Sequence, residues 1–489
     1  MPSNFPLWIA SSDKSARMNP RMGTLWIVLG LVCFELGCAS HGNNVVANRS
    51  PVSQELARRF GTTLSPPERP GKQIYPNGIS LANALTEEQA VLLALWNNAA
   101  FLELLTDLGV AQGDLVQAGL LPNPEVVYFF PVTDKPFKYA LDFPLEAVWL
   151  RPIRVAAAER EVDRVKQRLT QAGLDLIRDV RQAYADLVLA HLRQNVSSEA
   201  VRIRARIAEL AKIRLDAGDI SPQESSTAAI DAYRAQQDFS RTGFDIAIAE
   251  ERLRNLMGVS NDRTPLRLQA DPRNYPAALN VELLTAEATR SRPDALAAAQ
   301  FSLAASERLR LARIGWVRFL GMLDATSGRT TGHDFGPAFR TTLPIFNWNQ
   351  GGIARAAAEL ERAERQSQTI NNQIVQDVHQ SYLRYSQTQS ELQILNERVR
   401  PEVEVAIRRT QLAYEQGHVP YVVVLQTTQQ LIDSRFREVQ LQADLSRAWS
   451  DLERSVGRHL EDVRAPSPEL VPTPPQNSAP MPNANANPN

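Results

Sequence analysis

Two long stretches of the chain carry apolar residues at helical spacing against a background of charged and amide side chains. They cover residues 152–216 and 352–416 and are dominated by Ala, Arg, Glu, Gln and Leu, which are strong helix formers. At ~1.5 Å per residue, each stretch predicts a helix of roughly 97 Å. Because each helix has only a narrow apolar stripe, we expect that one copy cannot close a core of its own and packs laterally against other copies.

Four shorter helical stretches accompany the long ones. Two follow the long helices, over about 222–257 and 421–456, and two precede them, over about 80–119 and 281–313. Thr86-Glu87-Glu88-Gln89 has the pattern of a capping box near the start of a helix. A helix that follows and a helix that precedes a long one together match the length of one long helix. This predicts long helices lying beside stacks of two shorter ones.

Alternation with a period of two marks the strands. Large apolar residues at alternate positions of 137–145 and 339–345 predict two strands, and their expected partners are 125–130 and 316–324. One aromatic-rich face fits a transmembrane barrel and equally a small soluble β-layer with one buried face, so the strand pattern leaves both open. Four strands cannot close a barrel, whereas three copies of the chain would supply twelve.

These elements occur twice, at an offset within a residue or two of 200. Phe143-Pro144-Leu145 corresponds to Leu343-Pro344-Ile345, and the glycines Gly218 and Gly258 correspond to Gly417 and Gly457. A fixed internal period indicates a duplicated architecture. We therefore expect a first repeat over 79–258, a linker over 259–280 and a second repeat over 281–458.

The N-terminal segment is typical of an export signal. Arg21 and the apolar run Thr24–Phe34 predict a signal peptide over 1–37, followed by an extension or linker over 38–78 that is rich in loops. Leu36-Gly37-Cys38-Ala39-Ser40 resembles a lipoprotein signal in which Cys38 is lipidated, although Glu35 departs from that pattern. Ordinary cleavage beside Gly37 or Ala39 is the alternative. Residues 459–489, rich in Pro, Asn and Ser, are expected to form a disordered tail.

Composition argues against several classes of function. The net charge is −1, which gives no general attraction to nucleic acid. The two cysteines, Cys33 and Cys38, both fall in the N-terminal segment, so we expect no disulfide and no thiolate metal site in the mature chain. The six histidines are scattered and no phosphate-binding glycine loop is present, so the sequence predicts no enzyme, no catalytic residue, no metal site and no cofactor.

The ordered pair of strand–long helix–turn–helix units resembles the TolC-like outer-membrane efflux family over about residues 79–458. Further features of the resemblance are the Leu343-Pro344-Ile345-Phe346 exit, Gly351-Gly352, and the turn glycines. The resemblance implies a mainly α homotrimer whose 12-stranded barrel, four strands per chain, continues into a long coiled-coil tunnel in the periplasm. It also implies an exit duct in the outer membrane that passes substrate passively, and lipidation at Cys38 would make this duct lipid-anchored. The implied partners are outer-membrane lipid, a periplasmic adaptor (membrane fusion protein) and an inner-membrane transporter.

The turns between paired helices are the candidate functional sites. A tight turn at the end of such a helix needs a residue tolerant of positive φ, which explains Gly218 and Gly417, while Ser221 and Pro420 suit the starts of the returning helices. The resemblance implies that an adaptor docks on the tips, at Arg214, Gly218, Asp219, Ser221, Tyr414, Gly417, Val419 and Pro420. Alternatively, they are simply turns that any helical hairpin needs.

The resemblance also locates a periplasmic aperture just after the second tip. Family members often carry carboxylates there, whereas this chain has Val423 and Gln426. We therefore expect a more apolar constriction that divalent cations block weakly. The competing interpretation of the whole chain is a periplasmic adaptor or coiled-coil scaffold without a pore, but an adaptor would carry one hairpin flanked by β-rich domains. The sequence leaves open whether the cargo is metal, drug or polypeptide.

Overall fold

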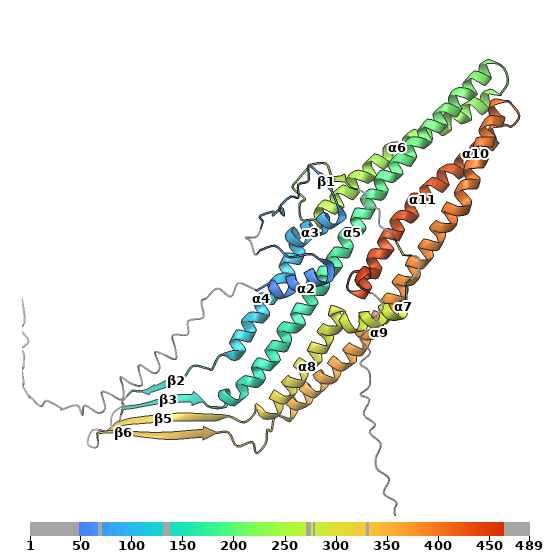
Figure 1. The fold of residues 1–489 in the computed structure, drawn as a ribbon. Coiled ribbons are helices and arrows are strands. Elements are labelled where there is room, and N and C mark those ends of the chain that lie inside the picture. The colour runs from blue at the N-terminus through green and yellow to red at the C-terminus, as the bar shows by residue number, and fades with distance from the viewer. Residues whose placement is uncertain are drawn as a thin grey trace, which may run out of the picture. The chain divides into compact units, whose positions relative to one another are not determined.

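The computed structural model describes residues 48–66, 71–130, 137–269, 275–276, 279–328 and 332–463. The expected signal peptide, Cys38 and most of the expected disordered tail lie outside these residues. Ten α-helices are described (Figure 1): α2 Ser50–Phe60, α3 Glu87–Asn97, α4 Ala99–Gly119, α5 Glu146–Asp216, α6 Pro222–Leu256, α7 Val281–Ser291, α8 Pro293–Ile314, α9 Gln350–Ile394, α10 Arg400–Glu415 and α11 Tyr421–Val456.

The predicted ranges of the returning helices α6 and α11 are confirmed. The first long helix, however, begins earlier than expected. α5 starts at Glu146, and Pro152 lies inside it. Hydrogen bonds to the neighbouring strand fix this start, because Leu145 N donates to Phe319 O (2.8 Å) and Phe319 N donates to the Glu146 carboxylate (3.1 Å). The prediction that Pro152 opens the helix was therefore wrong by about two turns.

The second long helix is interrupted, which corrects the expectation of one continuous helix. α9 passes through a π-helical turn, Leu395–Val399, before α10 begins. Pro401 is the second residue of α10, just after this turn. A proline has no backbone N–H and its ring clashes with the carbonyl four residues earlier, here that of Glu397, and a wider turn relieves this clash.

The half-length helices that precede the long ones are each divided in two. Asn98 separates α3 from α4, where its side chain caps α4 by accepting from Phe101 N (2.9 Å) and donates to Leu256 O (2.9 Å). Arg292 separates α7 from α8, and Pro293 opens α8. The capping box at Thr86 is confirmed. Helix α2 was not expected, since residues 39–78 were assigned to loops.

The strands form a four-stranded antiparallel sheet in the order β2-β3-β5-β6 (Figure 1). Their bounds are β2 Glu125–Phe129, β3 Phe137–Pro144, β5 Phe319–Gly328 and β6 Gly332–Thr341; a separate short parallel pair joins β1 Ala84–Leu85 to β4 Arg267–Leu268. The predicted strand 339–345 was wrong in its range. β6 ends at Thr341 because that residue pairs with Phe319, the first residue of β5, so Leu343 and Ile345 have no strand to pair with and are exposed.

The helices pack as expected, with shorter helices stacked along long ones. α4 and α6 lie along α5, while α8 and α11 lie along α9 (Figure 1). A large apolar cluster is buried among α2, α3, α4, α5 and α6. A Cβ on Gly173 of α5 would lie 2.9 Å from a Leu56 methyl group of α2, which shows how closely these helices meet. One copy of the chain therefore does close a core of its own, contrary to expectation, because α2 and α3 cover the apolar stripe of α5.

No single described helix combines the length and apolar character needed to cross a membrane. The α3–α4 pair, bent by 52°, satisfies the same test of length and composition only when its two helices are taken together.

Candidate functional site at the helical hairpin tips

Two turns with the same backbone geometry end the two helical hairpins. Gly218 has φ +79° and Gly417 has φ +75°, as expected for glycines required by a left-handed turn. In the first turn Asp219 N donates to Arg214 O, and in the second His418 N donates to Ala413 O, both at 2.8 Å. These are the backbone hydrogen bonds of helix-ending glycine motifs, so both glycine predictions are confirmed.

The returning helices begin differently. The Ser221 hydroxyl caps α6 by accepting from Glu224 N at 3.2 Å, as predicted. Pro420 occupies the corresponding position before α11, where its φ of −75° suits the turn but its side chain offers no acceptor. Glu224 supplies an acceptor instead, because its carboxylate accepts from Tyr421 N at 3.1 Å. The first hairpin therefore caps the second.

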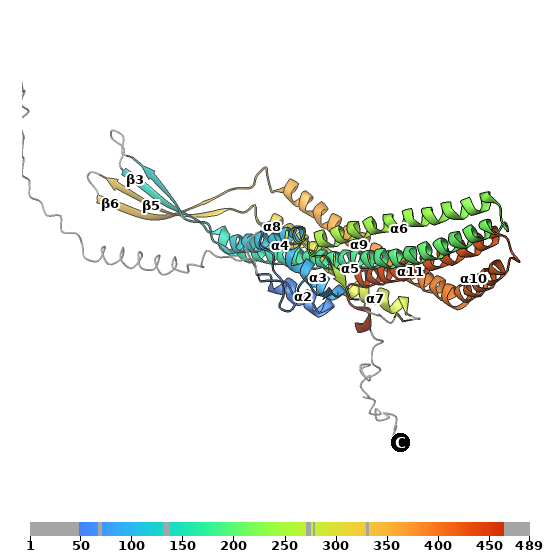
Figure 2. The same ribbon diagram turned by 90° about the horizontal axis from the view of Figure 1, so that it is seen from above.

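The two tips lie side by side, as both views show (Figures 1 and 2). Arg214 Nη1 donates to Tyr414 O at 3.3 Å, and its guanidinium carbon lies 4.7 Å from the centroid of the Tyr414 ring. A second contact lies further along the helices, where the Tyr421 hydroxyl donates to Asp231 Oδ2 at 2.9 Å. Charged and aromatic groups from different hairpins thus connect the tips.

The tyrosines at this junction are buried. Tyr414 is 2 % exposed, Tyr421 is 6 % exposed, and their ring centroids are 6.4 Å apart. Burial, followed by the hydrogen bond to Asp231, raises the pKa of Tyr421. Burial also raises the pKa of Tyr414, and the neighbouring Arg214 guanidinium opposes part of this rise. Both phenols are therefore protonated at neutral pH.

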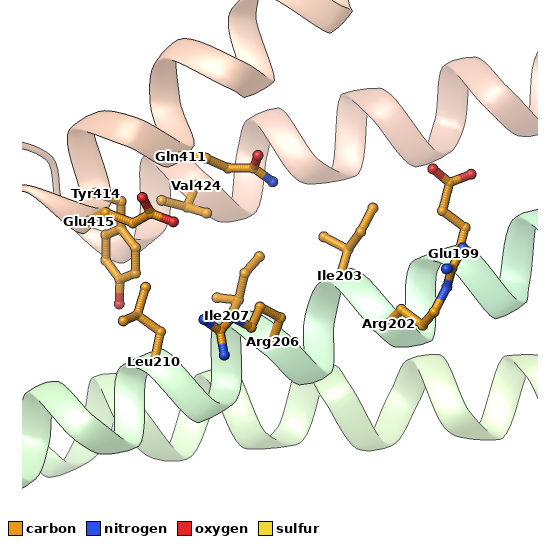
Figure 3. Close-up of a pocket in the computed structure, with 10 residues that line it drawn as sticks. All are labelled: Glu199, Arg202, Ile203, Arg206, Ile207, Leu210, Gln411, Tyr414, Glu415 and Val424. Carbon is orange, nitrogen blue, oxygen red and sulfur yellow. The ribbon is translucent and has the colours of Figure 1, made fainter.

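A groove of about 410 Å³ runs between the hairpins just below the tips (Figure 3). Ile203 and Ile207 rise into it from α5, and Val424 projects toward them from α11. Charged and amide side chains border this apolar floor. The full lining is Glu199, Arg202, Ile203, Arg206, Ile207, Leu210, Gln411, Tyr414, Glu415 and Val424.

The structure brings the predicted tip residues together but divides them by exposure. Five are exposed at the ends of the hairpins, namely Gly218, Asp219, Ser221, Gly417 and Pro420. Arg214 and Val419 are half-buried, and Tyr414 is buried, so it positions the tip and offers no outer surface. The expected aperture residues lie on α11, Val423 half-buried and Gln426 exposed.

Sequence reasoning missed the groove and the Tyr421–Asp231 hydrogen bond. Tyr421 and Asp231 are 190 residues apart, which differs from the period of the repeat, so the duplication gave no reason to pair these two residues. Within the described ranges, no group of three or more His, Cys, Asp or Glu side chains could hold a metal ion.

The sequence pattern of the outer membrane efflux proteins matches residues 137–259 and 284–458. The cobalt-zinc-cadmium resistance protein CzcC of Cupriavidus metallidurans is 24% identical over 420 residues, which cover 84% of this chain and 97% of CzcC. The cation efflux system protein CusC of Escherichia coli is also 24% identical, over 284 residues that cover 53% of this chain and 59% of CusC.

Solved structures with the same fold are outer-membrane proteins. A crystal structure of CusC has a TM-score of 0.66 at 16% identity, covering 80% of this chain and 98% of that one. VceC of Vibrio cholerae has a TM-score of 0.65 at 17% identity, covering 76% of this chain and 96% of that one.

Proposed function

The chain belongs to the outer membrane efflux protein family, and on this premise we propose that it is the exit duct of a tripartite exporter, assembled as a homotrimer. Members of this family are transport channels, which argues indirectly against an enzyme. They act as trimers together with a periplasmic adaptor and an inner-membrane pump. In the proposed assembly the pump supplies the energy and this chain provides a passive outlet.

The observation that carries the proposal is the division of the sheet into two unlike faces. Paired residues of an antiparallel sheet share a face, so the strand register assigns each side chain to one side. Among the side chains of this sheet that the structure describes, the charged ones fall on one face: Glu125, Lys138, Asp142, Asp324 and Arg340. The opposite face is apolar and includes Val126, Tyr128, Tyr139, Leu141, Phe143, Leu323 and Phe339. A transmembrane barrel has this arrangement, with its apolar face toward lipid.

The two unpaired edges of the sheet favour a barrel built from three copies of the chain. The order β2-β3-β5-β6 leaves β2 and β6 at the two edges of the sheet. Unpaired edges invite pairing with another chain, and β2 of one copy meeting β6 of the next would close a barrel of twelve strands. The long helices would then continue the duct into the periplasm.

The hairpin tips are the proposed docking surface for the adaptor. The exposed turn residues and the apolar groove beside them offer a helical partner both main-chain contacts and an apolar seat. Arg214 and Tyr414 would act indirectly, by holding the two tips together. In the trimer, Val423 and Gln426 would line an aperture without carboxylates, and lipidation at Cys38 would add an anchor in the outer membrane.

We propose metal cations as the cargo. This proposal rests on the printed functions of the relatives, cobalt, zinc and cadmium resistance for CzcC and cation efflux for CusC. A deletion strain is expected to become sensitive to divalent transition metals and to keep its tolerance of organic toxicants. Sensitivity to organic compounds alone would contradict the assignment.

The competing proposal, an adaptor or scaffold without a pore, fits the structure less well. An adaptor carries one hairpin between β-rich domains, whereas the described residues of this chain form two helical hairpins, one four-stranded sheet and one short two-stranded pair. Membrane fractionation combined with native mass spectrometry separates the two proposals. The duct predicts a detergent-requiring trimer in the outer-membrane fraction, and a soluble periplasmic monomer would refute it. A Cys38→Ser variant tests the lipid anchor separately.

A further inference from the structure

One row across the charged face of the sheet holds two carboxylates and no cation. The register pairs Glu125 on β2 with Asp142 on β3, Asp142 with Met322 on β5, and Met322 with Ala338 on β6. Like charges directly opposite each other destabilise an antiparallel sheet. The row Glu125–Asp142 therefore carries a local excess of negative charge.

One pair of neighbouring charges on this face is compensated. Lys138 Nζ lies 2.6 Å from Asp324 Oδ2, so that carboxylate is neutralised. Arg340 lies on the same face opposite Leu320, one row from Asp142. Among the charged side chains that the structure describes on this face, the two carboxylates of the Glu125–Asp142 row have no lysine or arginine in their own row.

Asp142 is the least satisfied member of this row. Its side chain is 7 % exposed, and its Oδ1 atom is buried without a hydrogen-bond partner. In the described part of the chain, no lysine or arginine forms an ion pair with either Asp142 or Glu125. A carboxylate buried without a counter-charge is costly, so a cation supplied from outside the chain would stabilise this row.

We propose that the Glu125–Asp142 row attracts small inorganic cations and makes the duct selective for cations. The inference rests on the proposed function, because it places the charged face of the sheet inside the pore. Three chains would contribute six carboxylates, and rings of carboxylates favour cations in pores. Since Val423 and Gln426 leave the proposed aperture without carboxylates, the selectivity would reside at the sheet and not at the tips.

Planar-bilayer recordings of the purified full-length protein under a KCl gradient test the proposal. The wild-type duct is expected to pass K⁺ in preference to Cl⁻. Asp142→Asn removes three charges from the trimer and should lower the K⁺/Cl⁻ permeability ratio by at least about threefold at low salt, with a smaller effect at high salt because of screening. Asp114→Asn, which removes an exposed carboxylate of α4, should leave the ratio unchanged.

Each outcome separates this inference from the proposed function. If the Asp142 variant fails to assemble, Glu125→Gln removes the opposite carboxylate at an exposed position and should lower the same ratio. Unchanged selectivity in both variants would overturn the inference while leaving the duct intact. A ratio that responds to Glu415→Gln and not to either row variant would locate selectivity at the tips and also overturn it. Absence of any conductance from wild-type protein would instead refute the proposed function.

Discussion

Replacing Tyr421 by phenylalanine removes one hydrogen bond between the two hairpins and little else. The ring stays in place because it is buried beside Tyr414, and the backbone N–H of residue 421 still reaches Glu224. The hydroxyl that donates to Asp231 at 2.9 Å is lost. The substitution therefore tests whether this bond holds the tips together.

The free energy that this hydrogen bond contributes follows from the burial of both partners. Tyr421 is 6 % exposed and Asp231 is 9 % exposed, so solvent screens their interaction little. A hydrogen bond to a charged group contributes about 2 kcal/mol, which corresponds to roughly a thirtyfold change in an equilibrium constant. Arg234 forms an ion pair with Asp231, but the pair is 3.8 Å long and Arg234 is mostly exposed, so it replaces little of the loss. We expect the population with separated tips to rise by about thirtyfold.

Distance measurements between spin labels on the two tips provide the assay. Asp219→Cys and His418→Cys introduce labels at exposed positions on different hairpins, and the native cysteines are confined to the N-terminal segment. Tyr421→Phe should add a population at longer distances to the wild-type distribution. Tyr233→Phe is the matched control, because Tyr233 lies on α6 and is 71 % exposed. Identical distributions for wild type and Tyr421→Phe would refute the reasoning.

Three further predictions concern stability. Gly218→Ala should lower the free energy of unfolding by about 1 kcal/mol, because alanine disfavours the left-handed φ of this position. Gly351→Ala should leave the stability unchanged or raise it in thermal unfolding, because Gly351 has free space around it and no such φ. Arg181→Met should lower the free energy of unfolding, measured by chemical denaturation, by about 3 kcal/mol, because it removes the cation that the buried Glu87 and Glu453 share. An equal loss in the exposed control Arg241→Met would contradict this. Because the pKa of Tyr421 is raised, its contribution to stability should be complete below about pH 10 and should decline as the pH rises further. Tyrosinate absorbance compared between wild type and Tyr421→Phe checks the last prediction, which a normal titration of Tyr421 would contradict.

Short-range signals explain the parts of the fold that were predicted correctly. The turn glycines, the Thr86 capping box and the bounds of α11 depend on backbone preferences and hydrogen bonds within a few residues. The errors arose where distant partners decided the outcome. β5 sets the end of β6, and Phe319 helps to fix the start of α5.

The sequence by itself determined the duplication, the order of the main helices and strands within the two repeats, and the positions of both tips, because local conformational preferences repeat wherever the sequence repeats. The tertiary structure alone decided which groups meet between the repeats. Tyr421 contacts Asp231, and Arg214 contacts Tyr414, because packed helices bring distant residues within hydrogen-bonding distance. Such contacts depend on the relative placement of whole helices, which no short-range pattern encodes. The same holds for the Glu125–Asp142 row, which exists only through the pairing of β2 with β3.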